Sequence, residues 1–505
     1  MQKNAVEYLE QAVLRYPDRT AFAADGEALT FAQINQLALK MGARLAGAVP
    51  VGRVVAVLGE RSVYTPALFL AALYAGCWVA PLGPELPPYR LRNILETLEP
   101  GAILTDGRCD ALLSELNFSG PVFRLADTMD DPDPADLLGY RRLAITDNDP
   151  CLILFTSGSS GKPKGVVIPH RAVIDAVDVY ADVFSIGPED ILGGQSPLDY
   201  VAAIRDIFLP LATGCQTVLI PRRLFATPGT LFEFLNQNKI TTLFWAAPAL
   251  SLCAELDAFS AVRPETVKKV IFTGSVLPNR HLRIWLENLP GAYFANHYGP
   301  TEITGSCIYC EVKGLDDPLL DRASLPIGHP FPNVKITLLD EQGRETPDEA
   351  LGEICVSGSR LALGYFNEPQ LNEAAFVRRV RDGLPETIYK TGDLGRRDAQ
   401  GVYTFHGRRD SQIKHMGHRI ELSEIETLGA AHPGVRRCVC LYGGPTTGQI
   451  RLFYEGEASA KELSLFLRAR LPAHMIPRKF QRMDALPATP GGKPDRAALA
   501  RLIDG

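Results

Sequence analysis

Short apolar runs rich in β-branched residues alternate with helix-like segments through most of the chain before Phe405. The run "VGRVVAVLGE" precedes "YTPALFLAALYAG", "CQTVLIP" precedes "TLFEFLNQN", and "VKKVIFTGS" precedes "PNRHLRIWLENL". This alternation is typical of βαβ units, in which helices connect parallel strands and cover the sheet. The pattern predicts an α/β fold with a large N-terminal domain of helix-covered, largely parallel sheets.

The character of the sequence changes after Phe405, where the polar and basic segment "HGRRDSQIKHMGHRIEL" is followed by short strand-like and helix-like stretches. A chain of 505 residues is also too long for a single hydrophobic core. Residues 411–505 contain 14 Lys or Arg against 9 Asp or Glu, whereas the whole chain has a net charge of −6. We expect a large core domain, residues 1–410, and a small basic α+β lid domain, residues 411–505.

Composition and charge exclude several classes of protein. The negative net charge argues against general binding of nucleic acid. The most apolar stretch, residues 66–84, is interrupted by Gly76 and ends in prolines, which favours a buried helix followed by a strand over a membrane span. The first residues contain no apolar signal core, so we expect a cytoplasmic protein with reduced cysteines. Cys307 and Cys310 form a CxxC without a second pair or a His cluster at zinc spacing, and we interpret them as packing positions.

The stretch "CLILFTSGSSGKPKGVVIPH", residues 151–170, has the composition of a phosphate-binding loop between two strands. Glycines let backbone N–H groups converge on an anion, while hydroxyls and lysines add donors and charge. The loop is not a Walker A motif, because Lys162 is followed by Pro163 rather than by Ser or Thr. The alternative is a polar hairpin turn without a ligand.

Three further clusters have the composition of active-site loops. They are "NHYGPTEITG", "YKTGDLGRRDAQGVYTFHGRRD", in which we expect Asp393 in a Gly-flanked turn, and "LPATPGGKPDRAAL", which places Lys493 on an exposed loop. Each has a structural alternative. Tyr298 could be a core aromatic and Asp393 a turn former. Arg408 and Asp410 could form a surface ion pair, and Lys493 could be a solvated lysine.

Jointly these motifs identify the sequence as similar to the adenylate-forming superfamily, which comprises acyl-CoA synthetases, luciferases and the amino-acid adenylation domains of nonribosomal peptide synthesis. The motifs "TSGSSGKPKG", "NHYGPTE", "YKTGDL", "GRRDSQIKHMGHRIELSEIE" and "LPATPGGKPDR" occur in the family's order, and the amino-acid adenylation group is the most similar. The resemblance implies that a carboxylate attacks the α-phosphorus of ATP, with Mg²⁺ bound, to give an acyl-adenylate and pyrophosphate. A thiol then takes the acyl group. Catalysis of the first step is mainly neutralisation and alignment of anions.

The resemblance also implies a role for each motif residue. Tyr298 would lie against adenine, with Asn296 at its edge and Gly299 in the same nucleotide-binding stretch. Thr301 would contact the α-phosphate and Glu302 would hold Mg²⁺. The residues expected to close over the β- and γ-phosphates are Thr156, Ser157, Gly158, Ser159, Ser160, Gly161, Lys162 and Lys164.

The remaining roles concern the sugar and the domain movement that the family makes. Asp393 would accept hydrogen bonds from both ribose hydroxyls, and Arg408 would support the same sugar. Lys493 would bridge the carboxylate and the α-phosphate during adenylation. Asp410 matches the hinge about which the mobile C-terminal domain swings, and Lys414 would replace Lys493 in the second half-reaction.

The substrate pocket departs from the family pattern. Anchored without gaps on "RDIFLPLATG", the position of the aspartate that grips an α-amine falls on Val201, and Asp199 lies two residues upstream. On an extended segment these residues would face the same side, about 6.6 Å apart, so we expect Asp199 to bind an amine on the β-carbon. A two-residue insertion that returns Asp199 to the usual place, for an α-amino acid, is the alternative. The other positions that match the pocket are Arg205, Pro248, Ile271, Thr273, His297, Gly305 and Ser306.

Arg205 could bind an acidic substrate side chain or pair with Asp206 or Asp199, and His297 is interpreted as a packed neighbour of the nucleotide site. The predicted function is activation of a small amino acid and its transfer to the phosphopantetheine thiol of a separate carrier protein in natural-product biosynthesis. Twelve residues follow Lys493 and no carrier-domain pattern occurs, which is why a separate carrier is expected. An acyl-CoA synthetase for another carboxylic acid, or an inactive homologue that binds a metabolite, are the alternatives.

Overall fold

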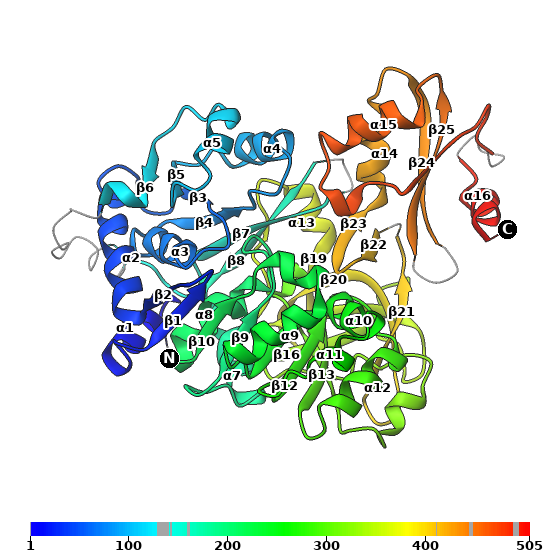
Figure 1. Cartoon of the computed structure of the whole chain (residues 1–505). Coiled ribbons are helices and arrows are strands. Elements are labelled where there is room, and N and C mark those ends of the chain that lie inside the picture. Colours follow the sequence, from blue (N-terminus) through cyan, green and yellow to red (C-terminus); the bar gives the residue numbers. More distant parts are fainter. Residues whose placement is uncertain are drawn as a thin grey trace.

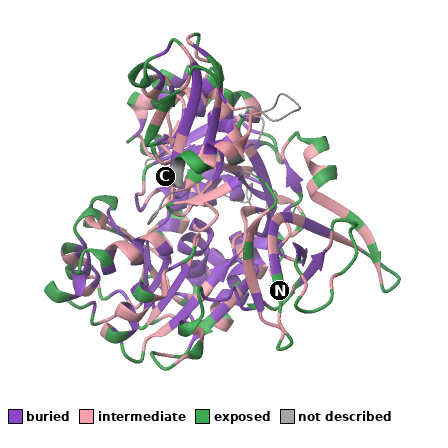
Figure 2. Ribbon diagram, turned by 90° about the vertical axis from the view of Figure 1, so that its right-hand side faces the viewer, coloured by how far each residue is buried: buried purple, intermediate pink, exposed green. Residues whose placement is uncertain are grey.

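The structure is a computed structural model that describes residues 2–128, 141, 144–158, 162–410, 412–443, 448–487 and 494–504. Within these ranges the chain forms a large body and a small lobe, which stands at the upper right of Figure 1. Buried strands form the centre of both parts, and exposed residues gather on the outer helices and loops (Figure 2).

The largest sheet has nine strands among the described residues, in the order β15-β14-β13-β12-β11-β9-β10-β1-β2. Neighbours from β1 to β13 are parallel, and β2, β14 and β15 add antiparallel edges. The bounds are β1 (Thr20–Ala24), β2 (Glu27–Thr30), β9 (Ile191–Gly194), β10 (Gln216–Leu219), β11 (Thr242–Ala246), β12 (Lys269–Thr273), β13 (Tyr293–Tyr298), β14 (Ile308–Val312) and β15 (His329–Pro330).

A second sheet follows the order β18-β8-β7-β4-β3-β5-β6 and is parallel from β7 to β6. Its antiparallel end is the hairpin of β7 and β8, to which β18 is added. The bounds are β3 (Val54–Leu58), β4 (Trp78–Leu82), β5 (Ala102–Thr105), β6 (Val122–Arg124), β7 (Pro150–Thr156), β8 (Lys164–Pro169) and β18 (Gly364–Tyr365).

Helices form layers around these two sheets. One hydrophobic cluster joins both sheets through the helices between them, α1 (Val6–Arg15), α2 (Phe31–Ala46), α3 (Thr65–Tyr74), α7 (His170–Val183) and α8 (Ala203–Thr213). The far face of the nine-stranded sheet packs on α9 (Pro228–Gln237), α10 (Ala247–Glu255), α11 (Ala258–Ala261) and α12 (Asn279–Asn288). The far face of the second sheet packs on α4 (Pro88–Leu98) and α5 (Asp110–Leu116). Short 3₁₀ helices lie at Leu125–Thr128, Arg222–Ala226, Thr301–Ile303 and Pro318–Asp321.

A third sheet of the body is wholly antiparallel and completes the site. Its strands follow the order β16-β17-β20-β19, with β21 also paired to β20. The bounds are β16 (Val334–Leu339), β17 (Gly352–Gly358), β19 (Phe376–Arg381), β20 (Leu384–Arg397) and β21 (Tyr403–Arg408), with helix α13 (Pro369–Ala375) before β19. A separate hydrophobic cluster joins this sheet to Tyr298 at the end of β13.

The small lobe has its own hydrophobic cluster, formed by buried residues from Ile420 to Met475. The hairpin of β22 and β23 lies between lobe and body in Figure 1, and a three-stranded sheet, β24-β25-β26, lies above it. The bounds are β22 (Gln412–His415), β23 (His418–Glu421), α14 (Leu422–Ala430), β24 (Val435–Gly443), β25 (Gln449–Gly456), α15 (Ala460–Arg468), a 3₁₀ helix (Ala473–Met475), β26 (Lys479–Arg482) and α16 (Arg496–Asp504).

The predicted α/β fold is confirmed, including the buried helix α3 and strand β4 within residues 66–84. No helix among the described residues is long and apolar enough to cross a membrane. All ten cysteines are free, and Cys307 and Cys310 are both buried without a metal-binding group around them in the described parts of the chain. The expectation of a turn at Asp393 is wrong. Asp393 lies inside strand β20, where the pairing register shifts, because Gly392 at φ +75° absorbs the irregularity.

Candidate active site

The hairpin of β7 and β8 carries the predicted phosphate loop, and Thr156 pairs with Lys164 at its open end. The buried hydroxyl oxygen of Thr156 has no hydrogen-bond partner among the described residues. Lys162 is exposed, whereas the ammonium of Lys164 lies 4.5 Å from the centre of the Tyr365 ring. Residues 159–161, predicted as part of the same loop (Ser159, Ser160 and Gly161), lie outside the described residues.

Donors of this loop contact the small lobe. Ser157 Oγ donates to the carbonyl oxygen of Arg419 at 2.9 Å, and the Gly158 N–H donates to Glu424 Oε2 at 3.3 Å. Glu424 also forms a buried ion pair with Arg90 at the start of α4. In this arrangement the lobe occupies the donors that were predicted to bind phosphate.

Glu302 is a fully buried carboxylate surrounded by donors from body and lobe. Tyr365 Oη donates to Glu302 Oε1 at 2.7 Å, and Arg419 Nη1 donates to Oε2 at 2.7 Å. Lys164 Nζ lies 3.7 Å from Oε1. Burial alone would raise the pKa of Glu302, but Arg419 and Lys164 outweigh it and bring that pKa to about 2. Glu302 is therefore ionised at neutral pH and ready to bind a cation.

The carboxylate of Glu302 is a suitable ligand for Mg²⁺ that arrives with a phosphate substrate. The described residues contain no group of three or more His, Cys, Asp or Glu side chains that could hold a metal by themselves. Mg²⁺ usually binds through one or two carboxylates plus substrate phosphates and water. A single buried carboxylate beside a phosphate loop meets that requirement, provided that Arg419 withdraws.

A pocket with about 90 Å³ of open volume lies beside the end of β13. Tyr298 and Asn296 line it, and Asn296 Nδ2 donates to the carbonyl oxygen of Pro326 at 3.0 Å. Gly299 also lines it, and a Cβ at this position would lie 2.2 Å from the carbonyl oxygen of Gly305. Only glycine fits there, so the backbone can approach closely. An aromatic ring beside a flat pocket suits a nucleobase.

Asp393 lies beside this pocket with both carboxylate oxygens engaged. Tyr298 Oη donates to Oδ2, and Arg408 Nη1 donates to Oδ1. Arg408 is itself held by Asp410, through Nε at 2.7 Å and Nη2 at 2.8 Å. A carboxylate has about four acceptor positions, so Asp393 retains room to accept a further pair of hydroxyls.

Of the two lysines predicted to alternate at the site, Lys414 belongs to the described residues. Lys414 Nζ of β22 lies 4.9 Å from the centre of the Tyr298 ring and 5.8 Å from that of Phe405. Burial lowers the pKa of Lys414, and Asp393 opposes that shift. Lys493 lies outside the described residues. Thr301 begins the 3₁₀ helix that carries Glu302.

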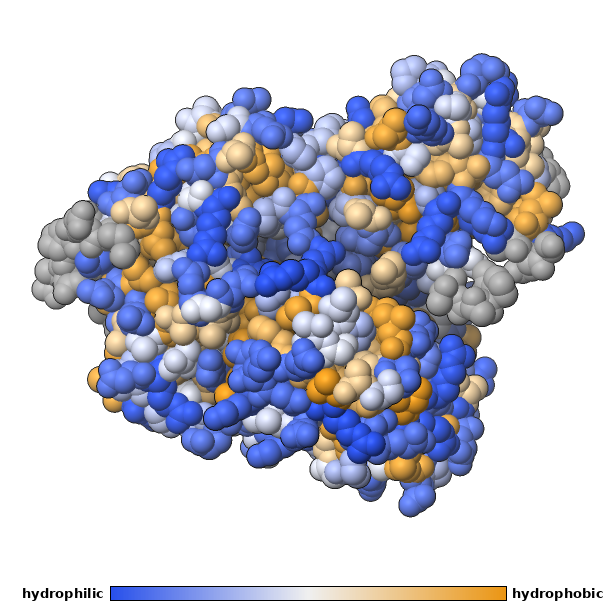
Figure 3. All heavy atoms as spheres, viewed as in Figure 1, coloured by the Kyte–Doolittle hydropathy of each residue, from blue (hydrophilic) through white to orange (hydrophobic). Residues whose placement is uncertain are grey.

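A second interdomain contact is made by the tip of the β22–β23 hairpin. Met416 and Gly417, at φ 51° and 81°, turn the chain, and Gly417 packs next to Ala246 and Pro248 of the body. His418 Nδ1 is 2.6 Å from Tyr200 Oη. In Figure 3 the small lobe meets the body across a notch with mainly hydrophilic visible edges.

His297 lies at the centre of a buried aromatic cluster on the other face of β13 from Tyr298. Its ring stacks on Tyr180 at 5.8 Å and lies 5.0 Å from Phe184. Neither ring nitrogen has a hydrogen-bond partner among the described residues. Burial, with Arg205 and Arg360 nearby, lowers the pKa of His297 well below its usual value, so its ring is neutral.

The other predicted pocket residues surround this cluster. Thr273 Oγ1 donates to the carbonyl oxygen of His297 at 3.1 Å, and Ile271 is buried on the neighbouring strand β12. The Ser306 N–H donates to Tyr180 Oη at 3.0 Å. A Cβ at Gly305 would lie 3.4 Å from the same oxygen. Most of the predicted pocket therefore converges around His297, while Pro248 lies at the hairpin tip.

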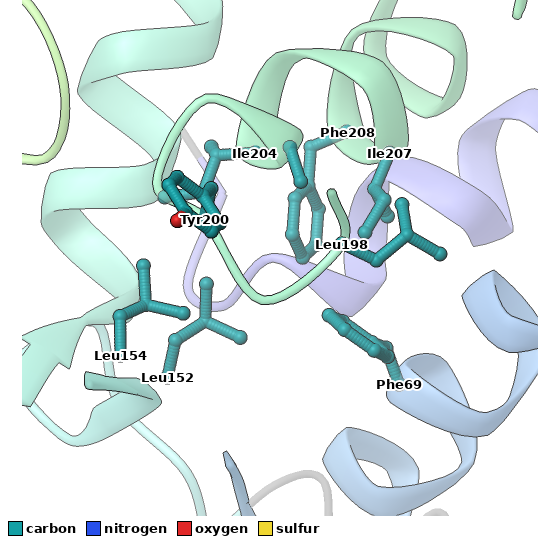
Figure 4. Close-up of a pocket in the computed structure, with 9 residues that line it drawn as sticks. Phe69, Leu152, Leu154, Leu198, Tyr200, Ile204, Ile207 and Phe208 are labelled. Carbon is teal, nitrogen blue, oxygen red and sulfur yellow. The ribbon is translucent and has the colours of Figure 1, made fainter. Parts of the chain in front are cut away.

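The geometry assumed for Asp199 is wrong, because residues 198–202 form turns rather than an extended segment. The Tyr200 N–H donates to the carbonyl oxygen of Pro197 at 3.2 Å. Figure 4 shows the consequence: Leu198 and Tyr200 line one apolar pocket with side chains of α3, β7 and α8. Val201 packs against the main core, so it does not share an extended face with Asp199.

The Asp199 carboxylate instead lies against Gly83 after β4 and accepts its backbone N–H. A Cβ at Gly83 would lie 2.4 Å from Asp199 Oδ2, so the carboxylate fills the space left by the missing side chain. Burial raises the pKa of Asp199 to about 6. Arg90 is near enough to oppose that rise, but no cationic side chain among the described residues lies within ion-pair distance of Asp199.

Sequence reasoning missed four residues that organise the site: Arg90, Tyr365, Arg419 and Glu424. Arg419 and Glu424 belong to "GHRIELSEIE", part of a motif quoted above. The motif therefore pointed to these two residues but not to the residues that they contact. Arg90 and Tyr365 meet their partners across long sequence separations, for which a single sequence provides no sign.

Comparison with known proteins agrees with this geometry. The model of the family described as AMP-binding enzyme matches residues 9–366. The chain is 34% identical to surfactin synthase subunit 1 of Bacillus subtilis (strain 168) over an alignment of 505 residues. This alignment covers 98% of this chain but only 14% of that protein. It is 31% identical to zwittermicin A synthase ZmaJ of Bacillus cereus, with 98% of this chain and 94% of that protein covered.

Among solved structures, holo-PA1221, an NRPS protein containing adenylation and PCP domains bound to a vinylsulfonamide inhibitor, is similar with a TM-score of 0.85. The identity is 25%, and 99% of this chain and 84% of that chain are covered. The chain belongs to the AMP-binding enzyme family. Enzymes of this family are AMP-forming ligases, and the chain is an adenylate-forming enzyme that activates a carboxylic acid.

Proposed function

We propose that the chain activates a small amino acid, with its amine on the β-carbon, as an aminoacyl-AMP and transfers the aminoacyl group to the phosphopantetheine thiol of a separate carrier protein. One observation carries the proposal. Lys414 of the lobe lines the pocket with Tyr298, the Asp393–Arg408 pair is bonded to Tyr298, and the ionised Glu302 lies beside Lys164 of the phosphate hairpin. Glu302 would bind the metal and face the phosphates, the Asp393–Arg408 pair would bind the ribose, and Lys414 would lie at the reacting centre.

In the first step an oxygen of the substrate carboxylate attacks the α-phosphorus of ATP. The bond from that phosphorus to the bridging oxygen breaks, and pyrophosphate leaves with the electron pair. Thr156 and Ser157 donate to the phosphates, Tyr298 packs on the base, and Asp393 accepts from the ribose. Mg²⁺, which Glu302 would hold, supplies charge neutralisation between the crowded anions. Lys493 bridges the carboxylate and the α-phosphate in this step.

In the second step the carrier thiol loses its proton, its sulfur attacks the acyl carbon, and AMP leaves. We propose that the present arrangement belongs to this half of the reaction, because Lys414 is at the pocket. Arg419 lies against Glu302, where a cation with ATP would bind in the first half. Since both cannot occupy that position, the lobe, residues 411–505, must turn relative to residues 1–410, with the hinge at Asp410.

The position of the amine rests on Asp199 and Val201. Val201 offers no charge where an α-amine would meet a carboxylate, and a buried unpaired ammonium costs several kcal/mol. Asp199 is a partly buried carboxylate without an ionic partner in the described structure, and an ammonium would supply one. Asp199 must release the Gly83 N–H or share it to make this contact.

The carrier and the compartment follow from separate observations. The similar structure holo-PA1221 contains a PCP domain as well as an adenylation domain. Carrier domains are typically acidic, and residues 411–505 of this chain are basic. Ten free cysteines fit a reducing compartment, so we propose the cytoplasm.

The test is ATP–pyrophosphate exchange across α-amino, β-amino and simple carboxylic acids, followed by loading of holo-carrier proteins or of free coenzyme A. We expect exchange with a β-amino acid to exceed that with its α-isomer, and Asp199→Asn to remove this preference. A preference for the α-isomer would defeat the β-amino assignment. Turnover with coenzyme A and none with any carrier would establish the acyl-CoA synthetase instead.

A further inference from the structure

Arg205 is a buried cation without a bonding partner. It lies in the first turn of α8 and is 4% exposed. Its guanidinium lies 5.1 Å from the centre of the Phe244 ring, and it forms no ion pair and no side-chain hydrogen bond among the described residues. A buried charge without a hydrogen-bonded partner is unfavourable, and a cation–π contact offsets only part of that cost.

A second arginine of the same aromatic cluster provides the contrast. Arg360 is fully buried over the Tyr180 ring, but its Nε donates to Asp175 at 2.8 Å and its Nη1 to the carbonyl oxygen of Ser306 at 2.8 Å. Arg360 thus has a carboxylate partner, although its Nη2 has no hydrogen-bond partner among the described residues. Arg205, in the same cluster, has no carboxylate within ion-pair distance in the described parts of the chain.

Asp206 is not within ion-pair distance of Arg205. Although it is the next residue, its carboxylate lies on the side of Gly194, where an added Cβ would be 3.3 Å from Oδ2. It accepts the Ser196 N–H, and Arg205 lowers the pKa of the Asp206 carboxyl more than Arg61 does, so the two charges interact only at longer range. Successive residues of a helix point about 100° apart, which accounts for this separation.

Arg205 lies near a second buried polar group that lacks a partner. It is close enough to His297 to lower the pKa of the imidazole, which belongs to the aromatic cluster on the face of β13 opposite Tyr298. Both ring nitrogens of His297 lack partners among the described residues. A neutral imidazole and a guanidinium, both unpaired and more than nine-tenths buried, thus point to an absent ligand rather than to a finished core.

We propose that Arg205 binds a second carboxylate on the substrate, distal to the one that is adenylated, with His297 donating a hydrogen bond to the same group. The enzyme would therefore select a diacid over its neutral analogues. A guanidinium suits this task because its planar fork matches a carboxylate. This inference rests on the proposed function, since it names the substrate class of that same site.

The experiment compares pairs of acids of equal size that differ only in a distal carboxylate or carboxamide: aspartate with asparagine, glutamate with glutamine, and succinate with succinamate. The wild-type enzyme should give a kcat/KM in ATP–pyrophosphate exchange about 100-fold higher for at least one diacid than for its amide. In Arg205→Gln that ratio should fall to about one or invert, mainly through KM, while Arg205→Lys should retain part of it.

Arg283→Gln removes a partly exposed arginine that pairs with Asp321 and does not line the pocket, and is the control. Exchange with equal efficiency for both members of every pair would overturn the assignment of Arg205 while leaving adenylation intact. No exchange with any acid would instead overturn the proposed function. If Arg205→Gln fails to fold, Arg205→Lys and the wild-type pairs still decide the question.

Discussion

Replacement of Arg419 by Gln is expected to slow thiol transfer without slowing adenylation. Arg419 Nη1 donates to Glu302 Oε2 at 2.7 Å, across the junction of lobe and body. A hydrogen bond between charged, buried groups contributes about 1.5–3 kcal/mol. Lys164 still lies 3.7 Å from Glu302 after the change, so the buried carboxylate keeps one cation. We take the loss as about 2–3 kcal/mol, which shifts the lobe equilibrium by about 30- to 150-fold.

The assay separates the two half-reactions. Supplied aminoacyl-AMP is mixed with enzyme and holo-carrier in a single turnover to measure transfer, and ATP–pyrophosphate exchange measures adenylation. Transfer by Arg419→Gln should fall by up to the factor given above, while exchange stays within about twofold of wild type. Arg437→Gln removes an exposed charge of the same lobe without touching Glu302 and should change neither rate. An equal fall in both rates, or unchanged transfer, would refute the reasoning.

Three further predictions follow from charge and position. Lys493→Ala should abolish pyrophosphate exchange but leave transfer from supplied adenylate intact; near-normal exchange would contradict its role. Asp206→Asn should raise Tm more at pH 8 than at pH 5, because burial raises the pKa of Asp206 to about 6. The native state then holds the proton on Asp206 more tightly than the unfolded state does. The free energy of unfolding of the wild type therefore falls by up to about 3 kcal/mol as pH rises from about 4 to 6. An equal change in Tm at both pH values would refute this. Carrier loading should weaken between low and high salt, because a basic lobe attracts an acidic carrier through exposed charges; salt-independent loading would remove that argument.

Much of the fold could be predicted because the periodicity of parallel strands and covering helices is local. The segment around α3 and β4, and the strand–helix pairs β10–α9 and β12–α12, lie where the alternation placed them. The third, antiparallel sheet was not predicted. Its residue Asp393 looked like a turn former, since glycines flank it, but an irregularity within a strand can also use a glycine at positive φ, as Gly392 does.

The site was predictable as a set of motifs and not as a set of contacts. Glu302 was expected to bind a cation, but its partner Arg419 comes from the other lobe, and only folding brings them together. The geometry expected for Asp199 was wrong for a similar reason. The missing side chain at Gly83, far away in sequence, creates the space that its carboxylate fills, and the turn at residues 198–202 ends the two-residue periodicity on which the expectation depended.

The burial of the cysteines has a consequence for an enzyme that makes activated acyl groups. Cys307 donates its thiol hydrogen to the carbonyl oxygen of Tyr298, with sulfur and oxygen 3.5 Å apart, which places it next to the nucleotide pocket. Burial raises the pKa of Cys307 to about 12, although Arg360 and Lys414 oppose this. Only the thiolate is nucleophilic, and at pH 7 that pKa leaves a thiolate fraction of about 10⁻⁵. Cys307 is thus protected from acylation by an adenylate formed in the proposed site.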